Sequence, residues 1–126
     1  MRYGLLRVLI SALIAFSCSS AASECVLPVP DGGDAEPSPP SLTGTILRVA
    51  PGQVVVGVAG TAKPQSVVVA PATELFTVYG GGFEFQDLRA GLHTLIWFKG
   101  CTPPKQGLPV AAVLEVCSLA PEPCPR

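Results

Sequence analysis

Between Leu42 and Val116 the chain is a succession of short apolar runs, each of which ends close to a glycine or a proline. Short runs rich in β-branched side chains predict strands, and the Gly and Pro residues between them predict turns. The runs that we expect to be strands are Leu42–Val49, Gln53–Val58, Ser66–Val69, Thr73–Tyr79, His93–Phe98 and Pro109–Val116. No ten-residue window has a convincing helical period. The pattern therefore predicts an all-β domain of five or six strands.

The strand His93–Phe98 is the densest apolar and aromatic run outside the N-terminal segment, so we expect the other strands to wrap around it. Val54–Val56 and Val67–Val69 are consecutive apolar runs, which predict strands that are covered on both faces or strongly curved. Closure into a barrel would also remove exposed strand edges. We therefore expect a small closed or partly open barrel.

The N-terminal residues have the order of a secretory signal peptide. Arg2 and Arg7 precede the apolar run Val8–Phe16, and small residues follow. This run is far shorter than the ~20 apolar residues that a membrane-spanning helix needs. Ser20-Ala21-Ala22 has small residues where a signal peptidase reads, so we expect residues 1–22 to be removed after Ala22.

A second interpretation of the same region stays open. Ala15-Phe16-Ser17-Cys18 resembles a bacterial lipobox, in which Cys18 would carry a lipid. An uncleaved anchor is the third alternative. The sequence therefore predicts export, either to the periplasm or extracellular space or to the outer membrane as a lipoprotein. Membrane association is expected only if Cys18 is lipidated.

Composition separates the rest of the chain into a domain and two tails. Residues 23–41 are rich in proline and we expect a disordered spacer; residues 42–117 form the barrel domain, and residues 118–126 a C-terminal tail. The net charge is −1, and the strands Gln53–Val58 and Ser66–Val69 carry no aromatic residue on which bases could stack. We therefore expect no nucleic-acid partner.

The cysteines predict a covalent framework. Either export route removes or modifies Cys18, which leaves an even number in an oxidising compartment, and three pairings of four cysteines are possible. The four that remain are Cys25, Cys101, Cys117 and Cys124. Zinc is the rival interpretation, but no two of these have C-x-x-C spacing and His93 is the only histidine. We expect no metal and no other cofactor.

Strand spacing excludes one pairing of these cysteines. If His93–Phe98 and Pro109–Val116 form an antiparallel hairpin, Cys101 lies at its loop end and Cys117 at its open end. Several residues at ~3.3 Å each then separate them, well beyond the ~7 Å limit for the Cα atoms of a disulfide. We therefore reject Cys101–Cys117. Of the two pairings that remain, we favour Cys25–Cys101 with Cys117–Cys124, because the second bridge closes a short proline-containing tail loop and the first would pin the N-terminal arm to the barrel.

The order of several short motifs over Leu42–Val116 resembles a known family. The motifs are Gly44-Thr45-Ile46, a Val-rich hairpin, Ala72-Thr73-Glu74-Leu75, Phe85-x-Asp87-Leu88-x-x-Gly91, a strand that ends at Gly100, and Ala111–Val116. This order is similar to the exported bacterial OB-like domain of unknown function fifty-six sixty-six. The resemblance implies a small five-stranded OB-like barrel and no established chemistry. The cysteines and the run Gly80–Gly82 are not part of the family's pattern.

A second resemblance competes with the first. Gly81-Gly82-Phe83-x-Phe85-x-x-Leu88-x-x-Gly91-x-x-Thr94-Leu95 is similar to the closing motif of the carboxypeptidase regulatory-like β-sandwich. That family implies a transthyretin-like sandwich. The strand that follows Cys101 fits the barrel better, because the sandwich motif ends soon after this glycine.

Candidate chemical groups are few. His93 has no second histidine as a metal partner, and Glu74, Glu84 and Asp87 flank turns, where carboxylates are normally solvated. Gly80–Gly82 lacks the lysine and helix of a phosphate loop. Trp97 and Phe98 are adjacent in a strand, so their rings point to opposite faces: one belongs to the core and the other could form a small apolar contact site.

These observations predict a non-enzymatic exported module that binds an envelope protein or a glycan. The alternative is a purely structural domain on a tether, with no ligand of its own. An exposed Trp97 or Phe98 would favour binding.

Overall fold

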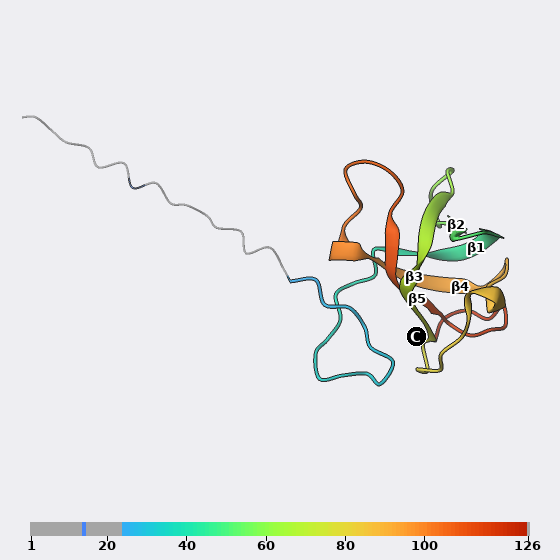
Figure 1. Cartoon of the computed structure of the whole chain (residues 1–126), viewed down its shortest axis with the longest axis horizontal. Coiled ribbons are helices and arrows are strands. Elements are labelled where there is room, and N and C mark those ends of the chain that lie inside the picture. Colours follow the sequence, from blue (N-terminus) through green and yellow to red (C-terminus); the bar gives the residue numbers. More distant parts are fainter. Residues whose placement is uncertain (1–13, 15–23, 126) are drawn as a thin grey trace, which may run out of the picture.

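The computed structural model describes residue 14 and residues 24–125, and these form a five-stranded closed barrel (Figure 1). The elements are β1 (Leu42–Ala50), β2 (Gln53–Gly57), β3 (Gln65–Thr77), the 3-10 turn η1 (Phe85–Asp87), β4 (His93–Phe98), the 3-10 turn η2 (Lys99–Cys101) and β5 (Val110–Val116). The expected signal peptide and Cys18 lie outside the described residues. Among the residues that are described, no helix is long and apolar enough to cross a bilayer.

The strands are hydrogen-bonded in the order β1-β2-β3-β5-β4, and β4 pairs with β1 to close the barrel. All neighbours are antiparallel except β3 and β5, which run parallel. This is the five-stranded, OB-like barrel that the sequence predicts. The transthyretin-like sandwich implied by the second resemblance is wrong as a fold, because the sheet closes into a barrel.

Strand β3 differs from the prediction because it joins the two expected strands Ser66–Val69 and Thr73–Tyr79. Its register with β5 shifts between Val69 and Glu74, around Pro71, which cannot donate a ladder hydrogen bond. Thr73 bridges this irregularity: its Oγ1 accepts from the Ala70 amide at 2.9 Å and donates to the Ala111 carbonyl at 2.6 Å. The hydroxyl therefore replaces ladder bonds, and five strands form where six could be counted.

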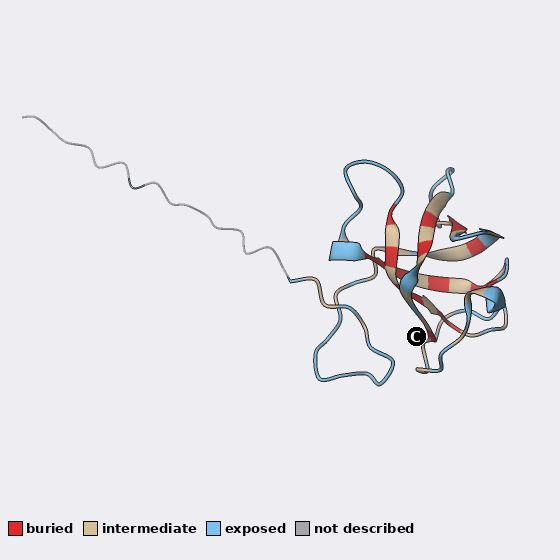
Figure 2. Cartoon of the chain, in the orientation of Figure 1, coloured by how far each residue is buried: buried red, intermediate tan, exposed pale blue. Residues whose placement is uncertain are grey.

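The interior of the barrel is filled by apolar side chains from all five strands and from the segment between β3 and β4. Figure 2 shows buried positions as red bands along the strands. The buried interior residues are Ile46, Val54, Val56, Val67, Val69, Leu88, Leu92, Ile96, Phe98, Ala111, Leu114 and Val116. Phe83 and Phe85 pack against this core from the segment around η1. The consecutive valines of β2 are buried, which confirms that this strand is covered on both faces.

A second, smaller apolar cluster lies on the outside of the barrel. Phe76 of β3, Val113 of β5 and Trp97 of β4 form it, with Leu95 and Cys101 packed against them. Because these three strands are neighbours in the sheet, the cluster spans one continuous outer face. It is buried although it does not belong to the interior.

The predicted hairpin is confirmed: β4 occupies His93–Phe98 and pairs antiparallel with β5. The structure joins Cys25 to Cys101 and Cys117 to Cys124, with Cα atoms 5.6 Å and 4.7 Å apart. These are the two pairings that the sequence analysis favours. The first attaches the N-terminal arm to the barrel, and the second closes a loop in the C-terminal tail.

Candidate functional site

The N-terminal arm, residues 24–41, has no helix or strand but lies against the barrel, where a free spacer was expected (Figure 1). The Cys25–Cys101 disulfide fixes one end of it. At the other end, Ser41 Oγ donates to the Cys101 carbonyl at 3.1 Å and accepts from the Phe98 amide at 3.0 Å. Both ends of the arm therefore meet at η2.

Within the arm, residues 26–38 form a closed loop. The Ser38 amide donates to the Val26 carbonyl at 2.8 Å, and the Val26 amide donates to Ser38 Oγ at 2.9 Å. On the barrel side, Gly80 has a φ of 91°, and a Cβ there would lie 2.5 Å from the Pro30 carbonyl oxygen. Glycine is therefore required where the loop touches the turn after β3.

Trp97 and Phe98 point to opposite faces of β4, as expected, but neither is exposed. Phe98 belongs to the interior and is 5% exposed, and Trp97 belongs to the outer cluster and is 4% exposed. The Trp97 Nε1–H donates to the Ser38 carbonyl at 2.7 Å. The hypothesis of an exposed aromatic contact is therefore corrected: the chain's own arm covers the outward-facing ring.

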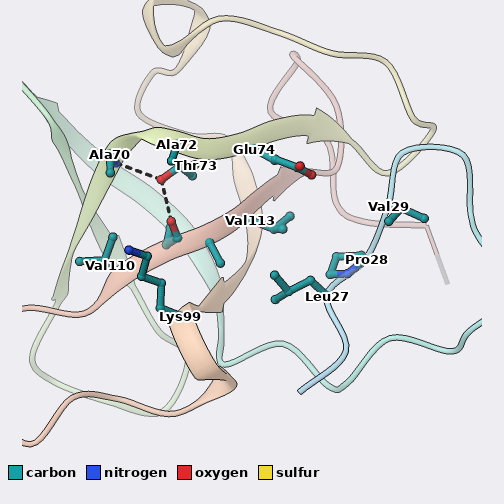
Figure 3. Close-up of a pocket in the computed structure, with 12 residues that line it drawn as sticks. Leu27, Pro28, Val29, Ala70, Ala72, Thr73, Glu74, Lys99, Val110 and Val113 are labelled. Carbon is teal, nitrogen blue, oxygen red and sulfur yellow. Dashed lines mark hydrogen bonds between the residues drawn. The ribbon is translucent and has the colours of Figure 1, made fainter. Parts of the chain in front are cut away.

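Beside the covered cluster, an apolar hollow of about 370 Å³ remains between the arm and the outer face of β3 and β5. Figure 3 shows Leu27 of the arm opposite Val113, with Lys99 toward one end and Glu74 toward the other. Small side chains, Ala70, Ala72 and Ala112, contribute to its lining. Such a concave apolar surface with one charge of each sign is a candidate binding site.

The polar groups of this hollow are suited to contact more than to catalysis. Both hydrogen bonds of the Thr73 hydroxyl go to backbone groups, so the oxygen is not activated by a neighbouring base. Lys99 and Glu74 are exposed. Exposed charges of this kind orient a ligand and give modest affinity.

The other candidate groups lie apart from the hollow. His93 is half-buried on β4, and its Nδ1 lies 3.4 Å from Thr45 Oγ1. Glu84 and Asp87 form a reciprocal capping box around η1 and are exposed. Within residue 14 and residues 24–125, no group of three His, Cys, Asp or Glu side chains could hold a metal ion.

Glu115 is the carboxylate that burial affects. Its cross-strand partners are Leu95 of β4 and Phe76 of β3, both apolar. This partial burial raises the pKa of Glu115 above its ordinary value. Glu115 lines a smaller hollow of about 210 Å³ beneath the arm's loop.

The outer face of β2 and β3, which binds oligonucleotides and oligosaccharides in many OB folds, has a different character here. Val55 pairs with Ser66, and Gln53 with Val68. The connection between β1 and β2 is the short turn at Pro51-Gly52, so it forms no wall beside this face. The arm and its hollow are therefore the more distinctive surface.

Sequence reasoning missed the residues that seat the arm, Ser38 and Ser41 with the prolines around them. The signal was available: Pro37-Ser38-Pro39-Pro40 is a stiff segment immediately before β1. The interpretation as a disordered spacer came from composition alone, which does not show that a stiff segment next to a strand can dock on it.

The chain matches no protein-family model, no curated protein and no solved structure. The resemblance to the exported OB-like family therefore stays a prediction that rests on the residues quoted for it.

Proposed function

We propose that the chain is an exported, non-enzymatic accessory module of the cell envelope that binds an envelope protein or a glycan. The two disulfides carry the proposal, because disulfides persist in oxidising compartments and staple small exported domains. They tie both tails of a small barrel to its body. The order of charged, apolar and small residues in the N-terminal segment supports the same route.

The hollow between the arm and the β3–β5 face supports binding as the activity. It is lined mainly by apolar side chains from three separate segments, and it carries Lys99 and Glu74 at its ends. The barrel's topology agrees with the fold that the resemblance to the exported OB-like family implies.

The experiment that tests export and framework is intact mass spectrometry of the protein recovered from its native envelope, with and without reduction. We expect loss of residues 1–22 and a mass increase on reduction that corresponds to four thiols. A diacylglycerol-sized addition at Cys18 would identify the lipoprotein form and direct the search for partners to membrane complexes. Free thiols before reduction would overturn the proposal.

A purely structural tethered domain is the second candidate, and one observation favours it. Trp97 and Phe98 are buried, so the aromatic contact that would have marked an open binding surface is covered by the protein itself. Cross-linking in the native envelope separates the two candidates. A binding module yields a defined adduct that is lost when Leu27 and Val113, the residues facing each other across the hollow, are both changed to Asp; a structural domain yields the same adducts in both forms.

A further inference from the structure

The outer face of β4 carries an arrangement that the proposed function does not use. Leu95 and Trp97 line an open hollow of about 650 Å³ together with Pro37, Pro39 and Pro40 of the arm. The Trp97 indole N–H donates to the carbonyl of Ser38, which stands between these prolines. The Trp97 indole therefore lies beside the proline-rich segment and donates its one hydrogen bond to a backbone carbonyl of that segment.

The proline-rich segment has its shape before it docks. Each proline holds φ near −65°, and each residue that precedes a proline is pushed toward extended backbone, so the sequence favours this conformation at Glu36, Ser38 and Pro39. Such a sequence favours the polyproline II conformation, which makes no internal hydrogen bonds and offers its carbonyls to a partner. Grooves lined by aromatic residues bind such segments at low entropic cost.

The arm and the barrel differ in overall charge. Residues 24–41 carry four acidic side chains, Glu24, Asp31, Asp34 and Glu36, and no basic one. The barrel, residues 42–117, carries five basic and four acidic side chains, a balance of five minus four, or +1. The charged residues that line the hollow are Glu24 and Glu36 of the arm, and Glu115 is the cross-strand partner of Leu95. Recognition at this face therefore depends on the prolines and the indole donor.

We propose that the Leu95–Trp97 face is a recognition site for proline-rich peptide segments of a partner protein, and that the arm occupies it in cis. Released from the arm, the face presents the indole donor and the apolar ring to a partner segment of the same Pro-x-Pro-Pro type. The arm then acts as a built-in competitor. This inference names a partner class for the binding module proposed above, and so rests on that proposal.

The arm is poised for such exchange because few contacts hold its proline segment. Pro37 and Pro39 are exposed, and beyond the Trp97 bond the anchors are those of Ser38 to Val26 and of Ser41 to η2. A tethered segment acts at a high effective concentration, so a free peptide competes poorly until the arm is loosened. The wild type should therefore bind a free peptide only when the peptide is in large excess, and a chain with a weakened arm should bind it at lower concentration.

The test uses the full mature chain with a loosened arm, Cys25→Ser/Cys101→Ser/Pro37→Gly/Pro39→Gly. The probe is a fluorescein-labelled peptide of residues 34–41, Asp-Ala-Glu-Pro-Ser-Pro-Pro-Ser, followed by anisotropy. We expect saturable binding to the loosened chain and at least about tenfold weaker binding to the oxidised wild type, because the wild-type arm competes. The Cys117→Ser/Cys124→Ser chain, whose arm is intact, is the matched control and should behave as the wild type does.

Two further comparisons locate the site. Trp97→Phe in the loosened chain should weaken binding about tenfold, because the indole donor is lost while the ring remains. A peptide with its three prolines changed to alanine should weaken binding similarly. Equal binding by the wild type and the loosened chain, or no effect of Trp97→Phe, would overturn the proposal.

A second measurement does not depend on the loosened chain folding. Trp97 is the one tryptophan in the sequence, so the ¹⁵N-labelled wild type gives a single indole N–H resonance. Excess peptide should shift or broaden it, and the alanine peptide should not; an unchanged resonance would contradict the proposal. A concentration-dependent dimer that excludes the peptide would assign the face to a second copy's arm and overturn the partner peptide. Failure here leaves the mass test of export unaffected, so the two proposals fail separately.

Discussion

The interior of the barrel and the outer cluster of Phe76, Trp97 and Val113 both exclude water, yet different parts of the chain cover them. The interior is enclosed by five strands whose ladders close on themselves. The outer cluster is covered by residues 24–41, which contain no helix or strand (Figure 2). The interior is therefore kept dry by a cooperative sheet, whereas the outer cluster is kept dry by an arm that a few contacts hold in place.

The difference concerns how each region opens. Exposing Ile96 or Leu114 requires the ladders of the barrel to separate, which amounts to global unfolding. Exposing Trp97 requires only that the arm leave. The anchors of the arm are one disulfide and a small set of hydrogen bonds, so the outer cluster should open at lower free energy than the interior.

The largest expected effect comes from the disulfide that anchors the arm. Cys25 and Cys101 are 76 residues apart and Cys117 and Cys124 only 7, and the chain-entropy stabilisation grows with loop length. We expect Cys25→Ser/Cys101→Ser to lower the free energy of unfolding by about 4 kcal/mol and Cys117→Ser/Cys124→Ser by about 2 kcal/mol. Urea unfolding of the oxidised proteins measures both. Equal losses of unfolding free energy in the two double variants would show that anchoring the arm stabilises the barrel no more than closing the short tail loop does.

The next effect compares two neighbours on β4. Ile96 is fully buried in the interior, whereas Leu95 points outward and is half-buried. Ile96→Ala should lower the free energy of unfolding by about 3 kcal/mol, because it leaves a cavity that closed strands cannot fill. Leu95→Ala should lower it by about 1 kcal/mol, the transfer of a partly buried side chain. The two chains are compared by chemical denaturation, and a larger loss for Leu95→Ala would reverse the comparison.

A smaller, local effect is expected at the arm's contact with β4. Trp97→Phe removes the donor to the Ser38 carbonyl and should lower the free energy of unfolding by about 1 kcal/mol. Amide hydrogen exchange distinguishes the regions: the Val26 and Ser38 amides should exchange faster, whereas amides of β2 and β3 should not change. The conservative interior change Val54→Ala serves as the control, because it should speed exchange throughout the barrel. Uniformly faster exchange in Trp97→Phe would contradict an independently opening arm.

The smallest effect is a pH dependence at Glu115. Burial beside Leu95 and Phe76 raises the pKa of this carboxyl in the folded state, so the native protein binds its proton more readily than the unfolded chain does. This contribution to stability is fully present below the unfolded pKa and is lost as the pH rises through the folded pKa. Glu115→Gln should therefore raise the free energy of unfolding at neutral pH. It should also make this free energy less dependent on pH below neutrality. Glu74→Gln, which removes an exposed carboxylate on β3, is the control and should leave the stability at neutral pH close to that of the wild type.

The strands illustrate how far local reasoning reaches. Strand β4 and its antiparallel pairing with β5 follow from apolar patterning and from the turn residues around them. Strand β3 was divided in two, because Pro71 indicates a break when only neighbouring residues are considered. The Thr73 hydroxyl bridges that break through Ala111, which is 38 residues away, and no local pattern contains that partner.

The sequence by itself determined the class of the fold, the five strands apart from the continuity of β3, and a cysteine pairing consistent with strand spacing. These depend on side-chain alternation, turn chemistry and the reach of the backbone, all of which act over a few residues. The tertiary structure alone decided that the arm covers Trp97, because the bond from its indole to Ser38 joins residues 59 apart in the chain. Such a contact depends on how the closed barrel turns its outer face toward the arm, and a one-dimensional pattern does not contain that orientation.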